Sequence, residues 1–186
     1  MRAVASFLLI GFLGLAPAAL AQAPAASPAA APDPNPLTAE ARRAVDRIAG
    51  NLLRMAEKMP EEHYGFQAVP EIRPFAATLG HTIDSRTRTC ASLSGSGAQP
   101  GASALKTKAE LVATMKASIA ECEKAFATLT DATIVGVVTG GRGGPRSRLA
   151  AVYGMVAHDN EEYGYLAVHM RLKGVVPPSS EAAPAR

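Results

Sequence analysis

Four segments of the chain, each about 20 residues long, carry apolar side chains in alternating steps of three and four residues. A stripe with this spacing lies on one face of an α-helix, because the helix has 3.6 residues per turn. In chain order the stripes run from Leu37 to Met59, from Phe75 to Leu93, from Leu111 to Leu129 and from Leu149 to Met170. No segment between them is a convincing strand. The pattern therefore predicts an all-α four-helix bundle.

Residues that favour helix ends mark the borders of these segments. Asn35 is a candidate N-cap before Pro36, and Thr107 and Glu110 have the spacing of a capping box. Gly174, which two prolines follow closely, is a candidate C-cap. We therefore expect helices over residues 36–60, 74–93, 107–129 and 145–172. The glycine-rich run 140–144 lacks the Gly-Lys-Ser/Thr ending of a phosphate loop, so we expect a turn there.

The N-terminal region has the layout of a secretory signal peptide. Arg2 precedes an apolar run from Ala3 to Leu15 and the small-x-small pattern Ala19-Leu20-Ala21. We expect residues 1–21 to be removed by cleavage after Ala21, which makes the mature protein periplasmic or secreted without stable membrane insertion. A retained N-terminal anchor is the alternative. Residues 22–36 then form an Ala/Pro-rich linker, residues 37–180 the bundle and residues 181–186 a disordered tail.

The charge balance excludes one class of partner. The full chain has a net charge of +3, and removal of the signal peptide takes away one arginine and no acid, which leaves +2. Lysines and arginines are scattered, tryptophan is absent and aromatic residues are few. Because nucleic-acid binding needs a basic surface, we expect no nucleic-acid partner.

His158 and Glu162 offer the spacing of a metal site. They are four residues apart, so one helix places them a turn apart on the same side, where two side chains can chelate one ion. His81, on another expected helix, is the candidate third ligand. It faces nearly opposite to the apolar stripe of its helix, beside Ser85 and Arg88, so it can act as a ligand only if an open cleft lies on that side.

Other titratable residues near this segment have weaker claims. His169 is eleven residues after His158, about 16 Å along a helix, which is too far to share an ion. His63 falls in a loop, where we expect a surface or packing role. Asp159 and Glu161 are candidate bases, but we expect both to be solvated charges on the helix face.

Several segments of the chain resemble the DinB family of four-helix-bundle proteins, and most closely its exported members. They are HDNEEYG, RLKGVVPPSS, MPEEHYGFQAVPEIRPFAATLGH and KTKAELVATMKASIAECEKAF, and the similarity spans roughly residues 37–180. The resemblance implies a divalent metal, Zn or Ni in the first place and Mn or Fe as alternatives. The metal is held by a histidine early in the second helix and by an H-x-x-x-H pair on the last helix.

His81 and His158 match the family positions, whereas Glu162 stands where the family usually has a second histidine. Two histidines and one carboxylate form a recognised ligand set with open positions. The departure also leaves open a family member that binds metal weakly or not at all.

The resemblance further implies that the second and third helices run parallel. Cys90 lies 16 residues after Pro74, and Cys122 lies 15 after Thr107, so parallel helices place the two cysteines at similar heights. A disulfide requires Cα atoms within about 7 Å, which antiparallel helices would not allow here. An even cysteine count in an exported chain favours a disulfide. Two buried free thiols are the alternative.

Three functions are compatible with these features. The first is a metal-dependent hydrolase or thiol transferase that acts on a small-molecule substrate. The second is a non-catalytic periplasmic protein that binds a metal or a small ligand. The third is a structural role in the envelope, with the bundle as a unit of a possible homodimer.

Overall fold

The computed structural model describes residues 32–139 and 144–181. The expected signal peptide, most of the expected linker, most of the glycine-rich turn and nearly all of the expected tail lie outside the described residues. Within the described residues, no helix is both long and apolar enough to cross a membrane.

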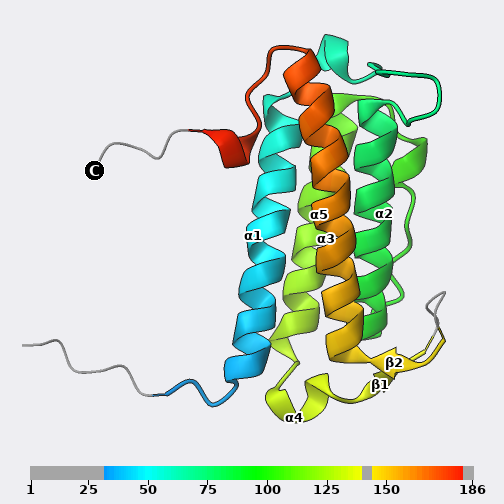
Figure 1. Ribbon diagram of the computed structural model, residues 1–186. Coiled ribbons are helices and arrows are strands. Elements are labelled where there is room, and N and C mark those ends of the chain that lie inside the picture. The colour runs from blue at the N-terminus through cyan, green and yellow to red at the C-terminus, as the bar shows by residue number, and fades with distance from the viewer. Residues whose placement is uncertain (1–31, 140–143, 182–186) are drawn as a thin grey trace, which may run out of the picture. The chain divides into compact units, whose positions relative to one another are not determined.

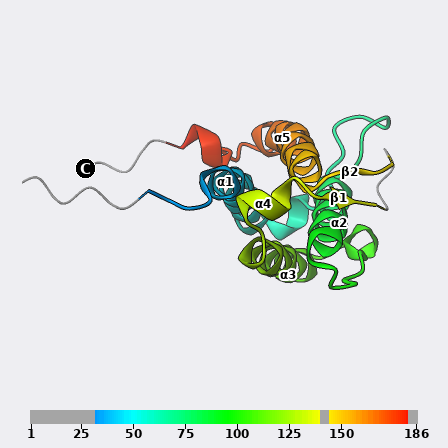
Figure 2. The ribbon, with the colours of Figure 1, turned by 90° about the horizontal axis from the view of Figure 1, so that it is seen from below.

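Four long helices form a bundle, as the apolar stripes predicted (Figure 1). They are α1 (Pro36–Lys58), α2 (Phe75–Ser94), α3 (Lys108–Ala127) and α5 (Arg148–Leu172). Seen along the bundle, α1 and α2 occupy diagonal corners, with α3 and α5 at the other two (Figure 2). The connections that the structure describes hold the short elements η1 (Glu61–His63), η2 (Ala102–Ala104), α4 (Asp131–Ile134), β1 (Val137–Val138), β2 (Arg146–Ser147) and η3 (Pro178–Ser180). The all-α bundle is confirmed.

The expected start of the last helix was wrong by three residues, and α4 and the strands were not predicted. Arg146 and Ser147 pair antiparallel with Val138 and Val137, so the backbone is still extended at these positions. The Ser147 side chain then accepts a hydrogen bond from the backbone N–H of Ala150, which starts α5 at Arg148. The capping box of Thr107 and Glu110 is present as predicted.

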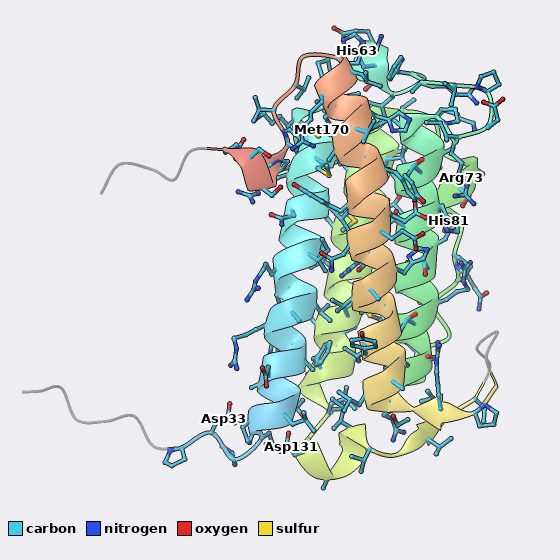
Figure 3. All side chains as sticks on the ribbon, in the orientation of Figure 1. Asp33, His63, Arg73, His81, Asp131 and Met170 are labelled. Carbon is cyan, nitrogen blue, oxygen red and sulfur yellow. A yellow bond between two sulfur atoms is a disulfide. The ribbon has the colours of Figure 1, made fainter. Side chains whose placement is uncertain are left out.

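The N-terminus of α1 is capped by a residue nearly 100 positions away in the sequence. Asn35 occupies the N-cap position as predicted, but its side chain accepts a hydrogen bond from the backbone N–H of Asp131. The Asp131 carboxylate in turn accepts hydrogen bonds from the N–H groups of Leu37 and Thr38, at 3.1 and 2.7 Å. This exchange fixes α4 against the start of α1, at the lower end of Figure 3.

The bundle core consists of the stripe residues, with one clear exception. Leu52, Leu79, Leu111 and Leu166, one from each long helix, are fully buried. Leu37 was expected to belong to the stripe but remains 39% exposed. It lies in the first turn of α1, beyond the end of the core.

Helices α2 and α3 run in the same direction (Figure 1). At the start of α3, the backbone N–H of Lys108 donates to the carboxylate of Glu61, in the connection that leads into α2. At the other end Cys90 and Cys122 form a disulfide, with their Cα atoms 4.8 Å apart. Of the two alternatives for the cysteines, the structure therefore has the disulfide.

The connection between α2 and α3 returns along α2 and packs on it. The Asp84 carboxylate accepts hydrogen bonds from the backbone N–H groups of Gly101, Ala102 and Ser103. One turn earlier, Gly80 lies so close to this connection that a Cβ atom there would be 2.6 Å from the carbonyl oxygen of Ala102. The hydrogen bonds of the Asp84 carboxylate hold the connection against α2, and the absence of a side chain at Gly80 lets it pack closely there.

Gly80→Ala is expected to lower the free energy of unfolding by about 1–3 kcal/mol, because the new methyl group overlaps backbone that must shift. The matched control is Gly50→Ala in α1, where a Cβ atom meets nothing within 4 Å. Alanine favours a helix interior over glycine, so the control is expected to gain about 0.5–1 kcal/mol. Urea unfolding measures both. A Gly80→Ala protein as stable as its parent would contradict this packing.

The variant Asp84→Asn tests the role of the Asp84 carboxylate through the pH dependence of the stability. Burial acts to raise the pKa of Asp84, but the hydrogen bonds from Ser103, Gly101 and Ala102 outweigh it, so the pKa is lowered. A lowered folded-state pKa stabilises the fold above the unfolded-state pKa of about 3.9, and this contribution is lost as the pH falls through the folded-state value. We expect the variant to be less stable by about 2 kcal/mol at pH 7. The difference should shrink steadily below about pH 4.

Urea unfolding between neutral and acid pH measures this difference, with Asp46→Asn as the control. Asp46 is an exposed carboxylate on α1. A stability difference at Asp84 that stays constant across the pH range would contradict the assignment.

Candidate metal centre

The structure brings His81, His158 and Glu162 together between α2 and α5. The Nε2 atoms of the two histidines lie 3.1 Å apart. Glu162 Oε1 lies 3.6 Å from the first of these atoms and 3.7 Å from the second. All three residues that the sequence singled out as candidate ligands therefore converge on one point.

Helix geometry explains the convergence. His158 and Glu162 lie one turn apart on the side of α5 that faces α2. His81 lies on the side of α2 away from the core stripe, as predicted, and that side opens into a cleft of about 750 Å³. Ser85 and Arg88 line the same cleft. Figure 3 shows His81 and Arg73 on this flank of the bundle.

The three side chains fit a divalent metal. Three atoms at these separations lie about 2 Å from a common point, which is the length of zinc–nitrogen and zinc–oxygen bonds. Glu162 is only 5% exposed, and within the described residues its Oε2 atom has no hydrogen-bond partner. The nearest arginine or lysine side chain is Arg73, whose Nη1 is 3.9 Å from Oε1. A buried carboxylate with so little compensation is costly unless a cation joins it.

The pKa shifts describe the same shortage of compensating charge. Burial lowers the pKa of His81, and the positive charge of Arg73 lowers it further. Burial raises the pKa of Glu162, although His158 and Arg73 act against this. Both shifts favour the neutral forms. A neutral imidazole is the form that ligates a metal, and a bound cation would favour the ionised carboxylate.

Asp159 lies behind His158 and is fully buried, so its expected place on the solvated face was wrong. Its Oδ1 atom is 4.0 Å from His158 Nδ1, and its other oxygen accepts a hydrogen bond from Arg86. Arg86 is also fully buried, and its Nη2 lies 3.8 Å from Cys122 Sγ. The Asp159 carboxylate raises the pKa of His158, while burial opposes this and Glu162 adds to it.

The Arg86–Asp159 ion pair was not predicted, although the sequence carries a signal for it. Arg86 falls between Ile83 and Cys90 on the core stripe of α2, and Asp159 falls between Val156 and Tyr163 on the stripe of α5. Two opposite charges at stripe positions of different helices indicate a buried pair, since neither charge is stable there alone.

The remaining candidates take the places expected of them. Glu161 is exposed, and His63 is partly buried in the loop before α2. His169 is buried away from the ligand group, where one ring nitrogen lies 3.1 Å from the carbonyl oxygen of Arg73. This contact holds the backbone of Arg73, whose side chain reaches Glu162.

Solved structures of similar fold share little sequence with the chain. A DinB-like protein from Bacillus cereus ATCC 10987 has a TM-score of 0.64 at 15% identity, over 74% of this chain and 93% of that one. A conserved protein from Enterococcus faecalis has a TM-score of 0.60 at 14% identity, over 73% and 96%. A mycothiol-dependent maleylpyruvate isomerase has a TM-score of 0.54 at 12% identity, over 70% of this chain but 59% of that one. Identities this low show the fold alone.

The family is identified from the sequence. No curated protein matches it. A family model of the DinB superfamily matches residues 44–166, which include His81, His158, Glu162 and both cysteines. That match covers well over half of the chain and agrees with the helical bundle and with the structural neighbours. The chain belongs to the DinB superfamily.

Proposed function

We propose that the protein is a metal-dependent enzyme that holds a divalent cation, Zn or Ni in the first place and Mn or Fe as alternatives, on His81, His158 and Glu162. The observation that carries the proposal is the convergence of these three ligand atoms, within 4.8 Å of one another, at the side of an open cleft. A cation there supplies Lewis acidity, which lowers the pKa of a water or thiol that coordinates it.

Of the two reactions considered, hydrolysis and thiol transfer, the cleft favours thiol transfer. Among the described residues that line it, Glu162 is the one carboxylate, and it is already assigned as a ligand. Asp159 is paired with Arg86, and Glu161 points to solvent. Hydrolysis commonly uses a separate general base, whereas a thiol needs only to lose its proton. The mycothiol-dependent isomerase of similar fold supports the same choice.

The proposed place of action is outside the cytoplasm, with a small molecule as the substrate. The Cys90–Cys122 disulfide supports this location, since such bonds form and persist in oxidising compartments.

The alternative is a binding protein that holds a metal or small ligand without turning it over. Glu162, at a position where the family usually has histidine, is the feature that favours it. The two functions differ in one observable. The enzyme turns over a thiol substrate and loses this activity on His158→Ala, whereas the binding protein has the metal affinity alone.

Metal content is the first test of the centre. We expect the purified protein to bind close to one equivalent of Zn²⁺ or Ni²⁺, and His81→Ala and Glu162→Gln to reduce binding at least about tenfold, because each removes one of three ligands. The measurements are elemental analysis and competition titration against a chelator.

Matched controls are available for both substitutions. His63→Ala removes a histidine outside the cleft, and Glu161→Gln removes the exposed carboxylate adjacent to Glu162. Both are expected to bind like the parent. A parent protein that takes up no metal after reloading with Zn²⁺, Ni²⁺ or Mn²⁺ would contradict the proposal.

Asp159 is expected to act as a positioning residue for His158. Asp159→Asn should weaken metal binding about 10- to 100-fold, as removal of a group that orients a ligand histidine does. It should also lower the free energy of unfolding by about 3–5 kcal/mol, because Arg86 is left buried without its counter-ion.

The double variant Arg86→Met, Asp159→Leu separates these effects. It removes both charges, so it is expected to recover most of the stability but not the metal affinity. Urea unfolding and chelator competition give the two quantities. Recovery of full metal affinity in the double variant would show that Asp159 acts through the fold alone.

A further inference from the structure

The cleft beside the ligand group is basic at the end away from the three ligands. It lies between α2 and α5, and its lining includes Val138 and Arg146 from the two short strands. Three arginines line it, Arg73, Arg88 and Arg146, against the single carboxylate of Glu162. The cleft therefore presents an excess of positive charge to any molecule that reaches the ligand group.

Two of these arginines make no ion pair or side-chain hydrogen bond within the described residues. Arg73 lies near Glu162, whereas Arg88 and Arg146 have no such partner among the described residues. Arg86, in contrast, is paired with Asp159, and Arg148 donates to a backbone carbonyl. The guanidinium groups of Arg88 and Arg146 are therefore available to a ligand in the cleft.

The positions of the two arginines indicate how far a bound anionic group would lie from the histidines. Gly154 lies one turn before His158, and a Cβ atom built on it would be 3.9 Å from Arg146 Nη1, with no other atom within 4 Å. The Arg146 guanidinium thus lies about 6 Å along α5 from the position of His158. Arg88 is seven residues after His81, about 10 Å along α2.

We infer that the cleft binds a small molecule with an anionic oxygen group, a carboxylate or a phosphate, which Arg88 and Arg146 hold about 6–10 Å along the helices from the positions of His158 and His81. Arginine suits this task, because its planar fork of N–H donors matches the oxygens of carboxylate and phosphate. Met155 and Val138 supply apolar contact for the carbon chain of the ligand, and Ser85 and Thr89 supply hydroxyls. The inference rests on the proposed function, since it names the substrate class of the same cleft.

Titrations with paired probes, followed by ¹H–¹⁵N NMR, test the inference. The probes are glutarate, its neutral-ended monoamide glutaramate, and inorganic phosphate. They are added to the full protein with and without Zn²⁺. We expect glutarate to bind at least about tenfold more tightly than glutaramate in the zinc form, because the amide gives up one charge-assisted contact. Tighter binding of phosphate than of glutarate to the metal-free protein would show that the arginine pair recognises a phosphate group.

The variant Arg88→Gln, Arg146→Gln is expected to lose at least about tenfold in glutarate affinity. Its control is Arg43→Gln, Arg47→Gln, which removes the same two charges from exposed positions on α1, outside the cleft. The control is expected to bind within twofold of the parent. Neither pair is buried, so the NMR spectra themselves show whether the fold is kept.

The inference is overturned if glutarate and glutaramate bind alike, if neither anion binds, or if the Arg88, Arg146 variant binds glutarate as the parent does. Its failure is distinguishable from failure of the proposed function. Anion binding that depends on the two arginines in a protein that takes up no metal would leave the inference standing alone. Metal uptake without anion selectivity would leave the metal centre and remove the inference.

Discussion

The buried ion pair of Arg86 and Asp159 is the interaction on which the geometry of the metal centre depends. Both side chains are fully buried, and each would be a costly isolated charge without the other. The pair therefore fixes how α2 lies along α5. Asp159 follows His158 directly and Arg86 lies on the same helix as His81, so the pair joins the two helices close to the point where the two histidines meet.

The path of the chain between α2 and α3 explains why one side of α2 stays open. Asp84 and Gly80 hold the connection against α2, so α3 starts at the same end of the bundle as α2 and runs beside it. The disulfide of Cys90 and Cys122 joins the two helices on the core side. The cleft then forms on the other side of α2, where His81, Ser85 and Arg88 face α5.

The sequence predicted what periodicity and spacing encode: the four long helices, the capping box at Thr107, and the candidate ligands as a group. It did not predict features made by pairing of distant residues. The strands at Val137–Val138 and Arg146–Ser147 are too short for a pattern, and the Asp131 cap on α1 depends on tertiary contact. Asp159 was expected to face solvent because it is charged, although its position on the apolar stripe of α5 indicates burial. The choice between a disulfide and two free thiols remained open until the direction of α3 was known. The signal peptide stays a prediction.

Anomalous diffraction at the zinc edge, from crystals of the zinc-reconstituted protein, tests the three-ligand centre most directly. We predict one strong peak between α2 and α5, within bonding distance of Nε2 of His81, Nε2 of His158 and a carboxylate oxygen of Glu162. An absence of signal there, or a peak at His63 or His169 instead, would contradict it. The bundle would then carry the family's fold without a metal at these residues.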